Sequence, residues 1–163
     1  MASELSAEVL RQLAEIEPSV DSFGLRLYPC SAQLRDGAVL TCVYLIDVAS
    51  FARIWGTERP EGVPGGVWSV SPDQISSVVE SPLRLPVRFA NEIYQAGESG
   101  MGYFDFCLVF SRWCRRDYLV GNFVDFLEYP LWKRPRDVKR VILHRNKRKL
   151  RSTPRTWWCV YAQ

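Results

Sequence analysis

The chain contains the stretch AVLTCVYLIDV at Ala38–Val48, which is almost continuously apolar and rich in β-branched and aromatic residues. These residue types favour strands, and the lack of polar alternation indicates a strand buried on both faces. Just before it, Arg35-Asp36-Gly37 is a turn signal, because glycine tolerates positive φ. Phe23, Leu25 and Leu27 alternate with polar neighbours, which predicts a further strand. We therefore expect a sheet with Ala38–Val48 as its central strand.

Further elements follow from hydrophobic periodicity along the rest of the chain. An apolar stripe over Ser3–Glu17 predicts an amphipathic helix, and the spacing over Val48–Trp55 predicts a short helix ending at Gly56. Alternation predicts strands at Leu83–Phe89 and Phe104–Phe110. We assign the first of these to a sheet edge because Pro86 cannot donate to a ladder. The fold class we expect is α+β, a mainly antiparallel sheet with an N-terminal amphipathic helix and short capped helices.

Two segments resemble each other. Ser71–Val79 (SPDQISSVV) and Arg134–Ile142 (RPRDVKRVI) each place a branched apolar residue three positions after a proline, followed by a pair of branched residues. Each pattern predicts a short capped helix, although the valines of the first also suit a strand. Each segment also follows a strand-like run with an aspartate, Asp47 or Asp125. This echo is compatible with two related β-β-α half-units, and the alternative is that capped short helices often look alike.

Charge is unevenly distributed along the chain. The last 31 residues, from Lys133 onward, hold eleven Lys/Arg and one acid, a net charge of +10. Residues 1–132 hold ten basic and seventeen acidic side chains, a net charge of −7. A dense positive segment attracts phosphates or acidic surfaces through a salt-sensitive field. We therefore expect one globular α+β domain at 1–144, with an acidic body, and a basic C-terminal extension at 145–163.

The basic end is the strongest binding signal. The side chains that we expect to bind nucleic acid or another polyanion are cations followed by two tryptophans: Lys133, Arg134, Arg136, Lys139, Arg140, Arg145, Lys147, Arg148, Lys149, Arg151, Trp157 and Trp158. Guanidinium groups bind phosphate, and aromatic planes stack on unpaired bases. Six bound phosphates would give a slope of log affinity against log salt of about −5. The same segment also fits a solvated tail without a dedicated partner.

A second candidate is the glycine-rich segment Gly97–Gly102, in which Glu98, Ser99 and Met101 are candidate contacts of a binding loop. It lacks the Gly-Lys-Ser/Thr ending of phosphate-binding loops, and the alternative is a plain connection between elements. For Asp47 and Asp125 we prefer helix capping to catalysis.

The five cysteines include no Cys-x-x-Cys pair, and His144 is the only histidine. Together with the acidic N-terminus, which lacks a secretion signal, this favours reduced thiols and a cytoplasmic location. Cys42 and Cys107 lie in apolar runs and are expected in the core. We expect no cofactor and no metal site, because a zinc site needs four closely spaced ligands.

These observations favour a non-enzymatic binding protein whose acidic body contacts a protein partner. The alternative is a nucleic-acid-binding protein that uses the C-terminal Lys/Arg/Trp segment. A small hydrolase built on scattered carboxylates and His144 is a lesser alternative. A membrane surface is disfavoured as a partner, and no small-molecule substrate is inferred.

Overall fold

The structure is a computed structural model that describes residues 3–143 and 153–163. The chain divides into two units: unit 1 comprises Met1–Pro82 and Arg155–Gln163, and unit 2 comprises Leu83–Pro154. Across the described residues the class is α+β, mostly strands together with three α-helices. The division differs from the expected single domain at 1–144, because the last residues of the chain belong to unit 1.

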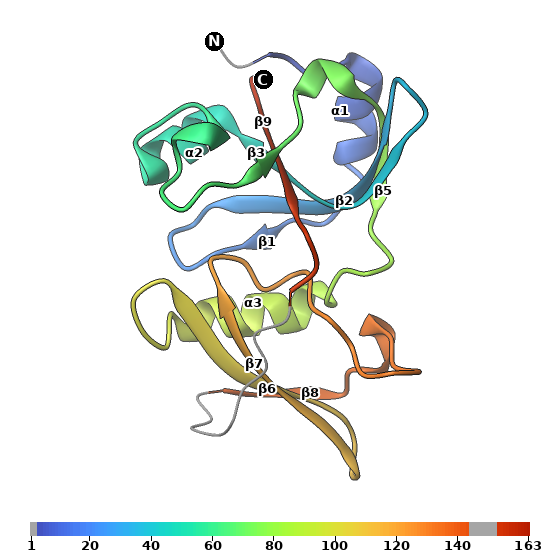
Figure 1. Ribbon diagram of the computed structural model, residues 1–163, viewed down its shortest axis with the longest axis vertical. Helices are drawn as coiled ribbons and strands as arrows, with labels where there is room; N and C mark the ends of the chain where they lie inside the picture. The colour runs from blue at the N-terminus through green and yellow to red at the C-terminus, as the bar shows by residue number, and fades with distance from the viewer. Residues whose placement is uncertain (1–2, 144–152) are drawn as a thin grey trace. The chain divides into compact units, whose positions relative to one another are not determined.

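Unit 1 is built on a mixed sheet with the strand order β1-β2-β3-β9-β4 (Figure 1). Its strands are β1 (Ser19–Val20), β2 (Arg26–Leu34), β3 (Val39–Asp47), β4 (Trp68–Ser69), β5 (Ile75–Glu80) and β9 (Trp157–Tyr161). Strand β2 pairs antiparallel with β1, β3 and β5, whereas β9 pairs parallel with both β3 and β4. The two parallel ladders make this sheet mixed, while the other ladders of the described residues are antiparallel.

Strand β3 lies inside the sheet, as the apolar stretch predicts, and Cys42 through Ile46 are buried. The preceding turn places Gly37 at a φ of 91°, the left-handed region that favours glycine. Helix α2 (Val48–Trp55) follows directly, and Asp47 caps it by accepting a 2.9 Å hydrogen bond from the Ser50 N–H. The helix ends at Gly56, as the sequence predicts.

Strand β9 comes from the C-terminal residues that the sequence analysis assigns to an extension. The sequence WWCVY enters the sheet beside β3, and Trp158 through Tyr161 are buried. A run of aromatic and β-branched residues without polar alternation suits a strand covered on both faces. The red strand at the centre of unit 1 in Figure 1 shows this placement. The C-terminal residues of the described chain are therefore part of the core of unit 1.

Helix α1 (Ala7–Leu13) is shorter than the predicted Ser3–Glu17. It begins at the N-cap Ser6, whose side chain accepts a hydrogen bond from the Val9 N–H. Val9 and Leu13 pack into the unit 1 core with residues of β2, β3 and β5.

Unit 2 contains an antiparallel sheet with the order β7-β6-β8. Its elements are helix α3 (Val87–Ala96) and the strands β6 (Tyr103–Ser111), β7 (Cys114–Gly121) and β8 (Arg140–Leu143). The strand predicted at Leu83–Phe89 is wrong, because α3 begins at Val87. Pro86 is the N-cap of α3, where a missing N–H costs no helical hydrogen bond. The buried side chains of α3 then follow a helical stripe: Phe89, Ala90, Ile93 and Tyr94.

The two similar segments form single 3-10 turns rather than α-helices. Turn η2 is Pro72–Gln74 and turn η3 is Pro135–Asp137, and a third such turn, η1, is Pro60–Gly62. Turn η2 leads into β5, which pairs antiparallel with β2, the first strand of the unit 1 hairpin. Turn η3 leads towards β8, which pairs antiparallel with β6, the first strand of the unit 2 hairpin. Proline and the following branched residues thus initiate an edge strand in each unit.

Candidate functional site

The two units differ in charge. Residues 83–154 hold fifteen Lys/Arg and seven Asp/Glu, whereas the residues of unit 1 hold six Lys/Arg and eleven Asp/Glu. The charge asymmetry seen in the sequence therefore follows the division of the chain into two units. Unit 2 carries the positive charge and is the place to look for an anion-binding surface.

Topology brings two segments of unit 2 to the same end of its sheet. The turn between β6 and β7 lies at residues 111–114, and β8 starts beside the end of β6, since Val109 pairs with Arg140. Val109 also pairs with Arg115 of β7, and its carbonyl accepts a 2.8 Å hydrogen bond from the Lys139 N–H. The residues that lead directly into β8 therefore lie at the same end of the sheet as the hairpin (Figure 1).

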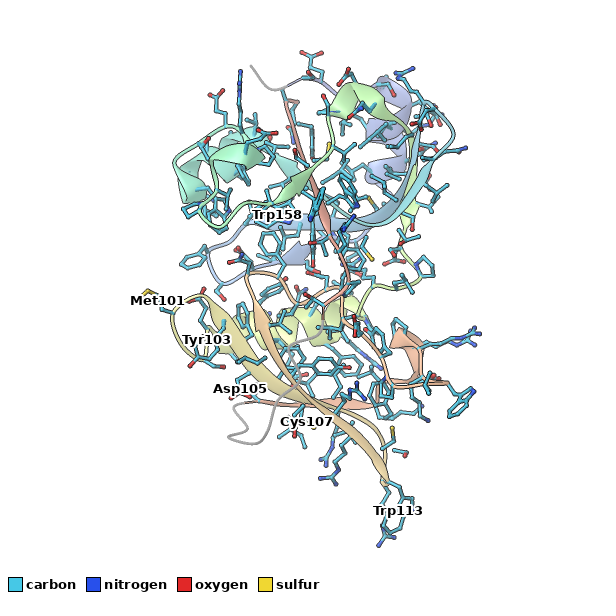
Figure 2. All side chains as sticks on the ribbon, viewed as in Figure 1. Met101, Tyr103, Asp105, Cys107, Trp113 and Trp158 are labelled. Carbon is cyan, nitrogen blue, oxygen red and sulfur yellow. The ribbon has the colours of Figure 1, made fainter. Side chains whose placement is uncertain are left out.

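Trp113 projects from the hairpin tip, as Figure 2 shows, and is 86% exposed. The Arg112 guanidinium carbon lies 4.9 Å from the centre of the Trp113 ring, within the range of a cation–π contact. The backbone N–H of Trp113 donates a hydrogen bond to the Ser111 hydroxyl, and this bond fixes the turn. The hairpin thus presents an aromatic ring with a guanidinium group on its face.

Trp132 lies in the loop before β8 and is 93% exposed. Its φ is 65°, a left-handed conformation that is unfavourable for a bulky residue. A hydrogen bond from the Lys133 N–H to the Pro130 carbonyl closes the turn around it. The backbone of this turn is therefore strained at a residue whose large apolar side chain lies in solvent.

We call this surface the basic-aromatic end of unit 2. Its members are the exposed or half-buried side chains of the two segments: Arg112, Trp113, Arg115, Leu131, Trp132, Lys133, Arg134, Arg136, Lys139 and Arg140. The basic run in the sequence predicts the five cations from Lys133 to Arg140 as binding residues, but it does not predict the hairpin residues or Trp132. The signal was the tryptophan inside each turn-forming basic run, RWCRR and LWKRPR.

Of the remaining candidates of the basic segment, the structure describes Trp157 and Trp158, and both belong to unit 1. Trp158 is only 4% exposed and packs against Phe51 and Trp55 in unit 1. Trp157 is half-buried in the same unit, with its ring 5.5 Å from that of Trp68. Arg145, Lys147, Arg148, Lys149, Arg151 and His144 lie outside the described residues.

The Gly97–Gly102 loop at the opposite end of β6 is organised by the two polar residues proposed as contacts. Glu98 accepts a hydrogen bond from the Gly102 N–H, and the Ser99 hydroxyl accepts one from the Asp105 N–H. Met101 is fully exposed at the loop tip, where Figure 2 labels it. The loop is therefore held by its own side chains, and Met101 is its candidate contact.

Asp125 and Tyr118 are polar groups of unit 2 whose side chains make structural hydrogen bonds. Asp125 is fully buried and accepts a 2.6 Å hydrogen bond from the Tyr94 hydroxyl, whose oxygen in turn accepts from the Val124 N–H. Tyr118 donates to the Glu128 carbonyl at 2.6 Å, and burial raises the pKa of its phenol. The two aspartates therefore have different partners. Asp47 caps helix α2, whereas the hydrogen bond between Asp125 and Tyr94 ties the segment after β7 to α3.

Comparison of the chain with protein-family models, curated proteins and solved structures finds no match. In residues 3–143 and 153–163, no group of three or more His, Cys, Asp or Glu side chains is placed to hold a metal ion. No helix in that part of the chain is long and apolar enough to span a membrane.

Proposed function

We propose that this chain is a non-enzymatic binding protein that binds single-stranded nucleic acid through the basic-aromatic end of unit 2. One observation carries the proposal: two almost fully exposed tryptophans lie in the two segments of unit 2, residues 111–115 and 131–140, that carry seven exposed or half-buried Lys/Arg side chains. This is the combination that unpaired nucleic acid requires, because bases stack on aromatic rings and phosphates bind cations. Bases within a duplex are stacked on one another and would not be available to these rings.

The kind of cation also favours phosphate. Five of the seven cations are arginines, Arg112, Arg115, Arg134, Arg136 and Arg140, whose planar guanidinium groups match phosphate oxygens in a bidentate manner. Arg112 already lies against the Trp113 ring, so a base stacked on the other face would have a phosphate-binding group beside it. The strained turn at Trp132 holds the second ring in solvent before any ligand binds.

Fluorescence anisotropy with labelled dT20 and rU20 at 50 mM salt tests the proposal. Trp113→Ala and Trp132→Ala should each weaken binding about 5- to 150-fold, which corresponds to the 1–3 kcal/mol measured for stacking of one base on an aromatic ring. Phe23→Ala removes an exposed aromatic side chain from unit 1 and is the matched control, with no expected effect. Tryptophan emission should fall on binding in the native protein and fall less in either tryptophan variant.

Two results would overturn the proposal. One is the absence of binding to either oligonucleotide at 50 mM salt. The other is binding that both tryptophan substitutions leave unchanged and that heparin matches in affinity, since it would show attraction to any polyanion. Association with anionic vesicles but not with oligonucleotides would assign the surface to a membrane instead.

We further propose that the two units are related half-units, each with a helix, a β-hairpin, a 3-10 turn and a returning strand. In support, the Ser71 N–H donates to the Gln74 side chain across η2, and the Arg134 N–H donates to the Asp137 side chain across η3. In this proposal α1, with Val9 and Leu13 in the core and Glu8 and Arg11 in solvent, is the amphipathic N-terminal helix of the first half-unit. The units would then have diverged in charge, with anion binding confined to unit 2.

We propose a cytoplasmic location and no cofactor for this function. All five cysteines are free thiols, and four of them are buried, which suits a reducing compartment. A protein-binding role of the acidic unit 1 is compatible with this proposal and rests on separate observations.

A further inference from the structure

Strand pairing places two arginines of the basic-aromatic end in one row of the unit 2 sheet. Val109 of β6 lies opposite Arg115 of β7 on one side and opposite Arg140 of β8 on the other. Directly paired residues project from the same face of a sheet, and the Cα atoms of the two arginines are about 10 Å apart across Val109. Val109 is only 6% exposed, whereas both arginines are exposed. Two guanidinium groups thus share one face of the sheet.

The face that carries this row lies opposite helix α3. Phe104 of β6 contacts Tyr94 of α3, with ring centres 5.5 Å apart. Because successive residues of a strand point to opposite faces, Phe104 and Val109 project in opposite directions. For the same reason Arg116, which follows Arg115 in β7, projects to the helix side, and it is half-buried. The row of Val109 therefore directs its two arginines away from the helix and into solvent.

The guanidinium groups of Arg115 and Arg140 are available to a ligand. Within residues 3–143 and 153–163, neither group forms a hydrogen bond, an ion pair or a ring contact. A phosphate monoester carries a charge of about −1.5 to −2 at pH 7 and has three terminal oxygens that accept hydrogen bonds. A phosphodiester inside a strand carries one negative charge and has two such oxygens. Two planar guanidinium groups, each able to bind two oxygens, therefore suit a monoester better than a diester.

A carboxylate bounds this row on the side away from the hairpin tip. Asp117 lies two residues after Arg115 in β7, so it projects from the same face in the next row. It is half-buried, and one of its carboxylate oxygens has no hydrogen-bond partner in the described parts of the chain. Repulsion from this carboxylate disfavours a second phosphate in that row. A bound strand would therefore extend only towards Trp113 at the tip, and the phosphate between the two arginines would be its last.

We propose that Arg115 and Arg140 together bind a terminal phosphate monoester, so that the basic-aromatic end recognises the phosphorylated end of a single strand. The two guanidinium groups donate hydrogen bonds to the terminal oxygens, and the base next to that phosphate stacks on Trp113. This inference rests on the single-strand binding proposed above and adds the class of ligand. A 5′-phosphate and a 3′-phosphate share this chemistry, and the experiment distinguishes them.

The experiment measures fluorescence anisotropy of the full chain with dT6 probes at 50 mM salt. The probes carry a phosphate at the 5′ or the 3′ end and fluorescein at the other end, and each is compared with its unphosphorylated counterpart. One phosphorylated probe should bind at least about 10-fold more tightly than its counterpart, because charge-assisted hydrogen bonds are added. Arg115→Lys and Arg140→Lys keep the charge but lose the planar fork, so each should reduce this preference at least about fivefold. Arg88→Lys changes an exposed arginine of α3 and is the matched control, which should keep the preference.

Unphosphorylated dT8 controls for charge, because its two additional phosphodiesters match the charge of a terminal phosphate. Equal binding of phosphorylated and unphosphorylated dT6 would overturn the inference and leave the proposed single-strand binding in place. A gain that dT8 reproduces would also overturn it, since it would show attraction by charge alone. A preference that both lysine variants keep would place the phosphate on other residues. Failure of every probe to bind would instead overturn the single-strand proposal and this inference with it.

Discussion

Tyr44 of β3 lies opposite Trp158 of β9 in the parallel ladder of unit 1, and both side chains are buried. The ladder joins the middle of the first unit to the last residues of the chain. Phe51 and Trp55 of α2 complete an aromatic cluster around Trp158, with ring centres 6.1 and 5.8 Å from it. The C-terminal strand is therefore required for the unit 1 core.

The first prediction concerns this strand. Trp158→Ala should lower the free energy of unfolding by about 3–5 kcal/mol, the usual cost of removing a large buried aromatic side chain. Urea denaturation followed by circular dichroism measures this change. Arg155→Ala, which removes only the exposed cation–π contact with Trp68, is the matched control and should cost less than about 1 kcal/mol. Equal midpoints for the two variants would contradict the placement of Trp158 in the core.

The second prediction separates binding from stability at Trp132. Glycine adopts a φ of 65° without strain, so Trp132→Gly should leave the protein as stable or raise its free energy of unfolding by up to about 1 kcal/mol. The same substitution should weaken oligonucleotide binding by the loss of one stacked base. Asn122→Gly, at a φ of 55° in the same unit, is the control that should leave binding unchanged. A large loss of stability in Trp132→Gly would show that the ring packs on the protein.

The third prediction concerns salt. If six of the cations contact phosphates of a single strand, log affinity should fall with log salt concentration with a slope of about −4. The double variant Arg134→Ala and Arg136→Ala should reduce the size of that slope by about 1.4. Arg53→Ala in unit 1 should not change it. Titrations between 50 and 300 mM salt measure the slope, and an unchanged slope in the double variant would place the ligand elsewhere.

Local patterns predicted local structure well. The apolar run of β3, the Asp47 cap and Gly56 all appear where the sequence places them, because each depends on near neighbours in the chain. Cys42 and Cys107 are buried, as their apolar runs predict. Leu83, Leu85, Val87 and Phe89 alternate and predict a strand, whereas the burial of Phe89, Ile93 and Tyr94 follows the period of helix α3.

Long-range pairing was not predictable in this way. The sequence WWCVY is compatible with a tail and with a strand. Only its pairing with β3, which is distant in the sequence, makes it a strand. Only part of the candidate site can be predicted from the sequence, because the rest also depends on long-range pairing. The cations from Lys133 to Arg140 are visible as a run, but the β6–β8 register that brings the Trp113 hairpin beside them is a property of the sheet.

The fourth prediction concerns thiol reactivity. Cys114, at the start of β7, is half-exposed, whereas Cys30, Cys42, Cys107 and Cys159 are buried. A thiol-specific reagent at pH 8 should therefore modify one cysteine rapidly and the other four only as the protein unfolds. Cys114→Ser should abolish the rapid phase. Rapid modification of a second thiol in that variant would contradict the burial of the others.

The fifth prediction concerns alkaline pH. Burial raises the pKa of Cys159 from the ordinary value of 9.0 to about 12, and burial also raises the pKa of Tyr161 in the same strand to about 12. Both groups are neutral when protonated, so between pH 9 and 12 the folded protein holds more protons than the unfolded chain. Their contribution to stability is thus complete below pH 9 and is lost as the pH rises towards 12.

Urea midpoints measured from pH 7 to 11.5 should fall above pH 9 in the native protein. Cys159→Ala replaces the thiol by a methyl group that cannot ionise, so its midpoint should be lower than that of the native protein at pH 7 but should fall less steeply above pH 9. The Cys114→Ser variant should follow the native curve, because its thiol lies outside the unit 1 core. Parallel curves for the native protein and Cys159→Ala would show that the β9 thiol does not titrate with unfolding, and the alkaline loss would then belong to Tyr161 and the other tyrosines.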